Sequence, residues 1–347
     1  MKKYLLLFVL VFFIACDEEI NTEGKSSIEV VSASDYSIFY GDTLVIYGEN
    51  FNQNDITLFA ITNKDTLDIN QGLIFVNKSE IKYINTILDG NYSLIVKSNS
   101  IYSKSIDVEF VNHPEIETVD INGGSFFLGS EKGPSNENPE KEILISKNLQ
   151  FSKFEVSEFL WKTVLNQKGI FNNSKTKPAS NLNWFQAVEF CNKLSNLWGL
   201  DSVYTIDSDV VGFDTLANGW RLPTESEWEY AALGKTESDY YGFDNPSQIA
   251  WYSKNSGYNI QPSGKLMANS FGMYDMLGNL EEWCWDYYSI TSYSQAKAVN
   301  PTGPNEGEFR VARGGNFKSG IAEIRCSSRV GNNNLETKGL RIVRTLQ

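Results

Sequence analysis

The stretch G-W-R-L-P-T-E-S-E-W-E-Y-A-A, Gly219–Ala232, contains the clearest helix start in this 347-residue chain. Pro223 precedes Thr224, and Glu227 follows Thr224 by three residues. Thr and Glu at this spacing form a capping box, in which each side chain accepts a hydrogen bond from the backbone N–H of the other residue. The stretch therefore predicts a helix that begins just after Thr224.

Two further helices are predicted before this one. Ser157 is a good N-cap for a helix with one apolar face, formed by Leu160, Trp161, Val164 and Leu165. Asn183 starts another helix, whose apolar face holds Trp184, Ala187, Val188, Cys191, Leu194 and Trp198. Cys191 is therefore expected to be a buried, inert thiol. From about Ser238 onward Gly, Asn and Ser are frequent, which predicts ordered loops whose backbone groups need side chains, water or ions as partners.

Residues 28–112 carry a β pattern throughout. Short apolar runs alternate with turn residues: Ile28–Val31, Thr43–Tyr47, Ile56–Ile61, Leu73–Val76, Ile81–Ile84, Tyr92–Val96 and Ile106–Phe110. Asp89-Gly90-Asn91 predicts a turn before the sixth run. About seven short strands in this length predict an immunoglobulin-like β-sandwich. His113-Pro114 then predicts a domain boundary, because proline holds the preceding residue in an extended conformation.

The N-terminus has the pattern of a secretory signal. Lys2 and Lys3 precede an apolar run, Leu5–Ile14, that is shorter than the roughly twenty residues of a membrane-spanning helix. The sequence F-F-I-A-C resembles a lipobox, which implies that residues 1–15 are removed and that Cys16 carries lipid. A plain secretory signal with an incidental cysteine is the alternative. Residues 16–27 would then be the acylated cysteine and a polar linker.

Composition and charge limit the kinds of partner and the cellular compartment that are expected for this protein. The formal net charge of −13 repels phosphate backbones, so no nucleic-acid partner is expected. Asp17-Glu18-Glu19 after the lipobox resembles the surface-export signal of Bacteroidetes-type lipoproteins, which implies a lipid-anchored, extracytoplasmic protein of the outer membrane or cell surface. With Cys16 acylated, Cys191, Cys284 and Cys326 remain, and an odd number leaves at least one unpaired or paired with another chain. One histidine and no C-x-x-C argue against a zinc or non-haem iron site.

Four segments in order resemble the formylglycine-generating enzyme (sulfatase-modifying factor) family. The first two are N-G-G-S-F-F-L-G-S (122–130) and F-E-V-S (154–157). The third is the stretch quoted first, which matches the family's R-L-P-T-E-A-E-W-E-Y-A. The fourth is N-S-F-G-M-Y-D-M-L-G-N-L-E-E-W-C (269–284), which matches the family's N-x-F-G-L-Y-D-M-x-G-N-V-W-E-W. The closing G-L-R-I-V (339–343) is similar to the family's G-F-R-x-V. The resemblance covers residues 119–347 and implies an α+β, C-type-lectin-like fold. In residues 28–112, G-D-T-L-V-I-Y-G-E-N-F (41–51) resembles the signature of IPT/TIG domains.

The resemblance fails at the two cysteines that carry the family's chemistry. In G-G-S-[FYW]-x-C-x-x-x-Y-C, two thiolates bind Cu(I) and oxidise a protein cysteine to formylglycine. Here Gly314-Gly315-Asn316-Phe317-Lys318 leads to Ser319, and Ile324 stands five residues later. Without two soft thiolates no copper site is expected. Cys326 lies seven residues after Ser319 and does not restore the pair; whether it bonds to Cys284 cannot be decided from sequence.

The resemblance also implies a calcium site and a ligand groove. Relatives offer Ca²⁺ two side chains and two carbonyls from D/N-x-x-G-N-x-x-E, here the side chains of Asp275 and Glu282 and the carbonyls of Gly278 and Leu280. Alternatively, Asp275 caps a turn and Glu282 pairs with an arginine. The groove that holds a C-x-P-x-R peptide in the family corresponds to Trp283, Arg313, Asn316, Phe317, Ser319 and Arg329. These residues could instead brace loops.

The sequence therefore favours a surface-tethered lipoprotein whose second domain is a non-catalytic recognition or structural module. Its partner would be a protein, a peptide or a glycan, and G-N-N-N (331–334) lies where C-type-lectin-like variable receptors diversify. A copper-type oxidase that makes formylglycine with an altered metal site is the alternative. A third hypothesis is an accessory domain of an ergothioneine-pathway enzyme. Such enzymes need a histidine-rich iron domain, which is not found in this sequence.

Overall fold

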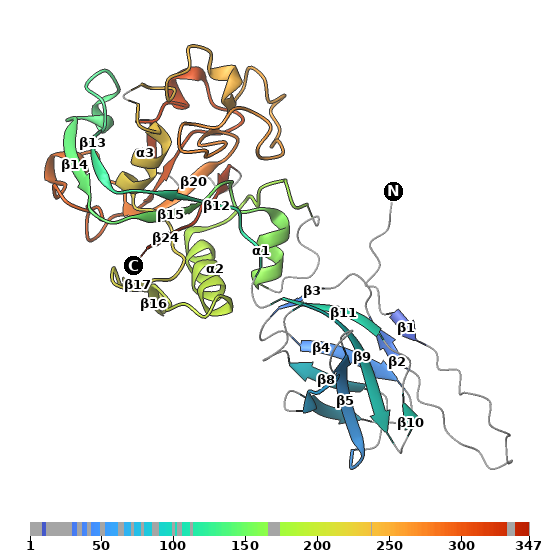
Figure 1. Ribbon diagram of the computed structural model, residues 1–347. Helices are drawn as coiled ribbons and strands as arrows, with labels where there is room; N and C mark the ends of the chain where they lie inside the picture. The colour runs from blue at the N-terminus through green and yellow to red at the C-terminus, as the bar shows by residue number, and fades with distance from the viewer. Residues whose placement is uncertain are drawn as a thin grey trace, which may run out of the picture. The chain divides into compact units, whose positions relative to one another are not determined.

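The computed structural model describes separate strands within residues 9–111, and then residues 114–165, 174–236, 238–331 and 337–346. Cys16, the linker after it, His113 and Asn332–Asn334 lie outside the described residues. The chain divides into two compact units, Met1–Pro114 and Glu115–Gln347. Each unit is described by itself (Figure 1).

Unit 1 consists of two β-sheets. The first has the strand order β1-β2-β4-β8-β7, and the second has the order β3-β11-β9-β5-β6 with β10 beside β9. The strands are β1 Val9–Val11, β2 Val30–Ser32, β3 Ser37–Phe39, β4 Thr43–Gly48, β5 Ile56–Ile61, β6 Thr66–Asp68, β7 Leu73–Asn77, β8 Glu80–Ile84, β9 Gly90–Ser98, β10 Ile101–Tyr102 and β11 Ile106–Val111. Neighbouring strands are antiparallel except β3 and β11, which are parallel.

All seven predicted runs of unit 1 overlap a strand. The predicted turn at Asp89-Gly90-Asn91 is wrong in detail, because β9 already begins at Gly90. Alternate residues of β5 and β9 are fully buried, among them Leu58, Ala60, Leu94 and Val96, as expected for a sheet with one face toward a core. β1 lies inside the segment predicted to be removed; it is an edge strand, so its removal leaves the other strands of its sheet paired.

The described residues of unit 2 form four helices and several small sheets. Its strands are β12 Thr118–Ile121, β13 Gly124–Leu128, β14 Lys141–Ile145, β15 Leu149–Ser152, β16 Tyr204–Asp207, β17 Val210–Phe213, β18 Ala250–Trp251, β19 Leu277–Gly278, β20 Glu281–Tyr287, β21 Arg310–Arg313, β22 Arg329–Gly331, β23 Lys338–Gly339 and β24 Val343–Thr345. The helices are α1 Glu158–Leu165, α2 Trp184–Leu197, α3 Glu225–Leu233 and α4 Ser292–Gln295, with 3₁₀ turns η2 Ser135–Glu137, η3 Pro246–Gln248 and η4 Ile321–Glu323.

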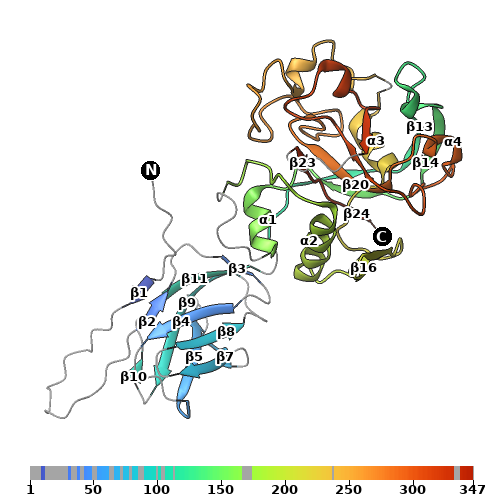
Figure 2. The same ribbon diagram turned by 180° about the vertical axis from the view of Figure 1, so that it is seen from behind.

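The largest sheet of unit 2 has the order β22-β21-β20-β23, and a three-stranded sheet has the order β12-β15-β24. One apolar core surrounds α3 and includes Trp228, Met276 and Ile324. A second core surrounds α2 and includes Phe190 and Trp283. Figures 1 and 2 show α2 beside the β16–β17 hairpin and α3 against β13 and β14.

The three predicted helices are confirmed, together with their caps. The Leu160 amide donates to the Ser157 hydroxyl at 3.1 Å before α1. Asn183 forms a capping box with Gln186 at the start of α2, and Thr224 forms one with Glu227 at the start of α3. These caps satisfy amides that a helix leaves without partners at its first turn. Among the described helices, none is long and apolar enough to cross a membrane.

Candidate functional site

The turn after β21 contains Gly314 and Gly315, which both have positive φ, and it leads into the predicted site residues Asn316, Phe317 and Ser319. Gly315 has a φ of +70°, and a Cβ there would lie 2.6 Å from the carbonyl oxygen of Glu323. Only glycine fits that backbone without strain. The turn places Asn316 beside Glu281, the first residue of β20. The Asn316 side-chain amide donates to the Glu281 carboxylate at 2.7 Å.

A pocket of about 260 Å³ lies beside this turn, and we call it the Ser319 pocket. Its polar lining comes from Glu281, Asn316, Ser319, Ser328, Arg329 and Thr337. Gly315, Ala312 and Val330 form an apolar wall, and the exposed residues Lys318 and Glu323 complete the lining. The pocket is therefore mainly polar and reaches the surface of unit 2.

Ser319 is held in a tight turn at the position of the family's first cysteine. Its hydroxyl accepts a hydrogen bond from the Asn316 amide at 3.1 Å, and its own amide donates to the Asn316 carbonyl at 2.9 Å. The residue is 7% exposed and lines the pocket. Its hydroxyl proton remains available to a ligand.

Ile324, at the position of the second cysteine, has different surroundings. It is fully buried and belongs to the apolar core around α3. Its Cγ2 lies 3.0 Å from the point where a Cβ on Gly315 would be. Ile324 does not line the Ser319 pocket, and none of the residues that line it is Cys, His or Met.

Glu281 and Lys338 form a buried ion pair at the pocket, which the sequence analysis did not identify. Lys338 is fully buried, donates to the Glu281 carboxylate and lies 5.4 Å from the centroid of the Trp283 ring. The Thr337 hydroxyl donates to the same carboxylate at 3.4 Å. The sequence contained a sign that position 281 is unusual. The family pattern G-N-V-W-E-W has tryptophan at this position, where this chain has Glu281.

The six predicted groove residues divide into two groups. Asn316, Ser319 and Arg329 line the pocket. Trp283, Arg313 and Phe317 do not line it; the Trp283 indole donates to the Leu182 carbonyl at 2.8 Å, and the Phe317 amide donates to the Asn279 carbonyl at 2.9 Å. These three therefore brace the fold, which is the alternative that the sequence left open.

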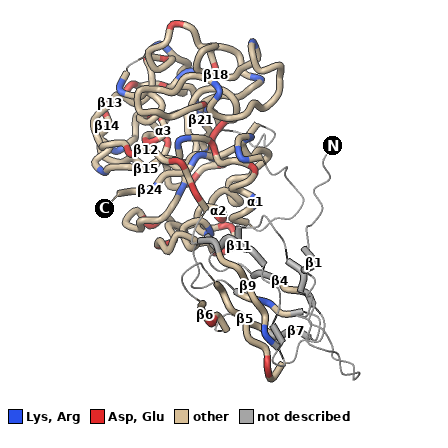
Figure 3. Tube along the Cα trace, turned by 45° about the vertical axis from the view of Figure 1, so that its right-hand side comes forward, with Lys and Arg blue, Asp and Glu red and all other residues tan. Residues whose placement is uncertain are grey.

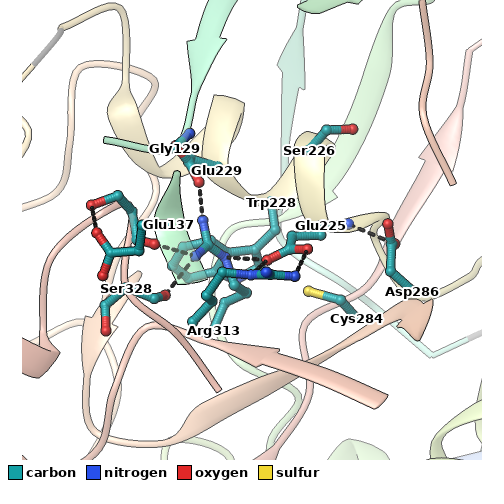
Figure 4. A network of polar contacts seen from close by, with 12 residues as sticks. Gly129, Glu137, Glu225, Ser226, Trp228, Glu229, Cys284, Asp286, Arg313 and Ser328 are labelled. Carbon is teal, nitrogen blue, oxygen red and sulfur yellow. Dashed lines mark hydrogen bonds and ion pairs between the residues drawn. The ribbon is translucent and has the colours of Figure 1, made fainter. Parts of the chain in front are cut away.

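Arg313, on β21, lies at the centre of a buried network that joins this strand to α3 (Figure 4). Its guanidinium donates to Glu229 and to the carbonyls of Cys326, Ser327 and Ser328. The Gly129 amide also donates to Glu229, at 2.8 Å. Burial raises the pKa of Glu229 to about 7 although Arg313 opposes this shift. The network fixes the segment that follows η4, because three of its carbonyls converge on one side chain.

Two further carboxylates belong to this network. Arg329 makes a bidentate pair with Glu225, through Nε at 2.6 Å and Nη2 at 2.7 Å. The Glu225 amide donates to Asp286 at 2.8 Å. Burial, and then the charge of Glu225, raise the pKa of Asp286 to about 8. This shift favours the protonated form of Asp286 in the folded chain.

Glu282, a predicted calcium ligand, is paired with an arginine in this structure. Both its oxygens accept from the Arg341 guanidinium, at 2.9 to 3.1 Å, and the Trp228 indole donates to it at 2.7 Å. Glu282 and Arg341 are fully buried. The pairing of Glu282 with an arginine, which was the alternative that the sequence left open, is thus the arrangement that the structure has.

Asp275 retains one oxygen without a partner. Its Oδ2 accepts from the Gly264 amide at 2.6 Å, while its Oδ1 is buried and has no hydrogen bond. The nearby Glu155 accepts from the Leu280 amide at 3.1 Å and from the Asn279 side chain at 2.8 Å. Burial, followed by the charge of Asp275, raises the pKa of Glu155 well above its usual value. Within the described ranges, no three His, Cys, Asp or Glu side chains form a metal-binding group.

The three described cysteines are free thiols. Cys191, Cys284 and Cys326 are buried, and the bond between Cys284 and Cys326 that the sequence left undecided is not formed. Burial raises the pKa of Cys326 to about 12 and that of the other two thiols above their usual value. Cys191 lies in the apolar core around α2, as predicted.

Comparison with known proteins agrees with the quoted motifs. Residues 107–346 match the family described as "Sulfatase-modifying factor enzyme 1-like domain". The "Chaperone protein LppX" of Paenibacillus barcinonensis is 30% identical over 267 residues, which is 66% of this chain and 89% of that protein. The formylglycine-generating enzyme of Streptomyces coelicolor is 34% identical over 114 residues, or 28% of this chain and 36% of the enzyme.

A solved structure supports the same relationship. "Treponema denticola variable protein 1" superposes with a TM-score of 0.61 at 26% identity, and the match covers 75% of this chain and all of that one. The three matched proteins have names of different kinds: a chaperone, an enzyme and a variable protein. The fold that they share therefore does not by itself fix an activity.

Proposed function

Because the chain belongs to the sulfatase-modifying factor enzyme 1-like family, we propose that its second unit uses the family's fold to bind a ligand and does not oxidise it. One observation carries this proposal. Ser319 lines the pocket at the position of the first cysteine, while Ile324, at the second position, is buried in the apolar core. The site thus keeps a cavity and lacks the family's pair of sulfur ligands.

The donor set of the Ser319 pocket does not fit copper. Cu(I) prefers soft thiolate or thioether ligands, whereas this pocket offers hydroxyls, an amide and carboxylates. The carboxylate of Glu281 is already paired with Lys338. Cys284 and Cys326 are buried in the core around α3 and do not line the pocket.

The binding role is supported by the way the pocket is built. Its polar residues are held by hydrogen bonds from β20, the glycine turn and β23, so their positions are fixed before a ligand arrives. Preformed polar groups lower the entropy cost of binding. The ligand would be a protein, a peptide or a glycan.

A position outside the cytoplasm is the second part of the proposal. The lipobox-like F-F-I-A-C predicts that Cys16 is acylated and holds the chain at the outer membrane or cell surface. Unit 1, with its two β-sheets and its IPT/TIG-like motif, would then be a spacer between the lipid and unit 2. Replacing Cys16 with serine should move the protein from the membrane fraction to the soluble fraction and abolish labelling by radioactive palmitate.

Metal content tests the non-catalytic role. The full-length Cys16→Ser chain is offered Cu(I) under reducing conditions, dialysed, and analysed by mass spectrometry for copper atoms per chain. We expect no retained copper and no aldehyde on a C-x-P-x-R peptide. Stoichiometric copper together with aldehyde formation would overturn the proposal in favour of the oxidase.

We also propose that the chain binds calcium through Asp275, the nearby Glu155 and the carbonyls of Gly278 and Leu280. The cation would replace hydrogen bonds that the Glu155 carboxylate accepts from Ser263 and Asn279. The buried Oδ1 of Asp275 has no partner, and hard oxygen ligands suit this cation. Calcium should raise the melting temperature of the chain, and Glu155→Gln should remove that rise. Glu142→Gln, at an exposed position of β14, is the matched control and should leave it unchanged. An unaltered calcium response in Glu155→Gln would contradict this ligand set.

A further inference from the structure

All seven arginines of the chain lie in unit 2, and five of them pair with a carboxylate. The ion pairs of the described residues include neither Arg310 nor Arg344. Arg344 donates to the Gln150 side chain at 2.8 Å, whereas Arg310 is surrounded by aromatic rings. The five pairs join Arg221 to Glu227, Arg313 to Glu229, Arg325 to Glu137, Arg329 to Glu225 and Arg341 to Glu282.

Rings from β20 and α2 hold the Arg310 guanidinium in place. Arg310, the first residue of β21, lies directly opposite Tyr287, the last residue of β20. Its guanidinium carbon lies 3.5 Å from the centroid of the Tyr287 ring, 3.7 Å from that of Trp184 and 4.9 Å from that of Trp285. Its Nη1 also donates to the Trp285 carbonyl at 2.5 Å. Because a planar guanidinium is attracted to the faces of such rings, its position is fixed before a ligand arrives.

The charge of Arg310 is not neutralised by its neighbours. Burial lowers the pKa of Arg310 to about 10, although the charges of Tyr287 and Asp286 oppose this shift. Asp286 is engaged elsewhere, because its Oδ2 accepts from the Glu225 amide at 2.8 Å. A cation that leaves water without a counter-ion loses hydration energy that nothing replaces. An anionic ligand group at Arg310 would offset that loss.

Part of the guanidinium remains free to bind such a group. Arg310 is half-buried, and its acceptors among the described residues are the Trp285 carbonyl and the Tyr287 side chain. A guanidinium has five N–H donors in one plane, so further donors are left. Two parallel N–H groups of an arginine match the two oxygens of one carboxylate. The geometry therefore suits a planar anion.

Half-buried rings beside Arg310 favour an anion that carries an apolar group. Trp285 and Tyr287 alternate with Asp286 along β20, so both rings lie on the face that Arg310 shares. The half-buried ring of Phe213 lies 4.7 Å from that of Trp285. The neighbouring Arg221, 5.8 Å from the Phe213 ring, is already paired with Glu227. A doubly charged phosphate would thus meet one available cation, whereas an apolar carboxylate would also cover the rings.

We propose that Arg310 binds the carboxylate of a ligand and that an apolar group next to this carboxylate packs on Trp285 and Tyr287. The ligand is either the carboxyl end of a polypeptide or a small aromatic acid, which share this chemistry. The site is separate from the Ser319 pocket, because none of the three residues lines that pocket.

The test uses the full-length Cys16→Ser chain and isothermal titration calorimetry at low ionic strength, because salt screens charges at a surface. The probes are phenylacetate, its neutral analogue phenylacetamide, acetate and inorganic phosphate. A short peptide that ends in phenylalanine, with a free carboxylate or with a terminal amide, tests a chain end as the ligand.

Two variants change the cation, and one serves as a control. Arg310→Gln removes the charge, and Arg310→Lys keeps the charge without the planar set of donors. Lys297→Gln removes an exposed positive charge near β14 and is the matched control. Circular dichroism shows whether each variant is folded, and Arg310→Lys takes the place of Arg310→Gln if the latter is not.

We expect phenylacetate to bind more tightly than acetate, phosphate or phenylacetamide. Its Kd should rise at least about tenfold in Arg310→Gln, rise less in Arg310→Lys and stay unchanged in Lys297→Gln. Tighter binding of the peptide acid than of phenylacetate would support a chain end as the ligand, and the reverse order would support a small acid.

Three results would overturn the proposal: equal binding of phenylacetate and phenylacetamide, tighter binding of phosphate, or an unchanged Kd in the folded Arg310 variant. Failure of both phenylacetate and the peptide acid to bind would overturn it as well. None of these results would affect the proposed function, because the Ser319 pocket is intact in all three variants.

Discussion

Ser319 and Ile324 occupy the two positions where the family has thiols, and the structure gives them unlike surroundings. Ser319 lines an accessible pocket, whereas Ile324 is enclosed by the apolar core around α3. A thiol at position 319 would meet the pocket, but it would find no second sulfur there. Recovery of the family's chemistry therefore requires more than one substitution.

Ser319→Cys alone should give a folded protein without oxidase activity. One thiolate cannot supply the pair of soft ligands that Cu(I) needs. The measurement is aldehyde formation on a C-x-P-x-R peptide in the presence of Cu(I), with the unaltered chain as control, and the two should be indistinguishable. Copper-dependent aldehyde from the single variant would show that another sulfur reaches the pocket.

Asp286 should make the stability of unit 2 fall as the pH rises. Its pKa is raised to about 8 in the folded chain and is about 4 when unfolded, so folding takes up a proton between these values. Its contribution is complete below about pH 4 and is lost toward pH 8, with a slope of at most about 1.4 kcal/mol per pH unit.

Asp286→Asn should flatten that pH dependence and stabilise the protein near pH 8, because an amide oxygen can still accept from the Glu225 amide without carrying charge. Urea unfolding at several pH values measures the effect. Asp207→Asn, at an exposed position of β16, is the control and should keep the full slope. An equally steep slope in Asp286→Asn would mean that Glu155, Glu229 or another buried acid dominates.

At the scale of elements, the helices of unit 2 could be predicted because their caps are local. Ser157, Asn183 and Thr224 each bond an amide three residues ahead, and the sequence contains both partners. The strands of unit 1 could be predicted equally well, from the alternation of apolar and polar residues. α4 was missed, since Thr291 makes no side-chain cap and the helix is only four residues long.

Thr224→Ala should lower the free energy of unfolding of unit 2 by about 1 kcal/mol, within the usual range for a lost N-cap. The Glu227 amide would lose its partner, while Glu227 would still pair with Arg221. Thr291→Ala is the matched control, because Thr291 precedes α4 without a capping hydrogen bond. Chemical unfolding measures both, and equal losses in the two variants would contradict the capping role.

The site was harder to predict than the helices, because its partners are far apart in sequence. Glu281 meets Lys338 across two neighbouring strands, and Glu282 meets Arg341 across a separation of 59 residues. A motif shows which residues are present but not which of several arginines a buried carboxylate faces. Asn316, Ser319 and Arg329 could be placed by resemblance, whereas the bracing roles of Trp283 and Arg313 required the fold.

At the scale of the whole molecule, the chain consists of two units with separate cores. Leu58 and Val96 belong to unit 1, and the two clusters around α2 and α3 lie entirely within unit 2. Acidic and basic positions are interspersed along unit 2 in Figure 3, so its negative charge is not gathered in one tail. Such units are expected to fold independently.

Calorimetry of the full-length chain should therefore show two unfolding transitions. The fragment 115–347 alone should keep one of them, with a melting temperature within about 5 °C of its value in the whole chain, because a shift of that size corresponds to only a few kcal/mol. A fragment that is unfolded at all temperatures, or a single transition for the whole chain, would show that the units depend on each other.

At the extracytoplasmic location that we propose, the three buried thiols would make the unfolding of unit 2 irreversible. While unit 2 is folded, Cys191, Cys284 and Cys326 are shielded and cannot react with oxidants. If unit 2 unfolds in an oxidising medium, the same thiols can form non-native disulfides, which prevent refolding. The working lifetime of the protein would then be set by how rarely unit 2 opens, and not by the balance between its folded and unfolded forms.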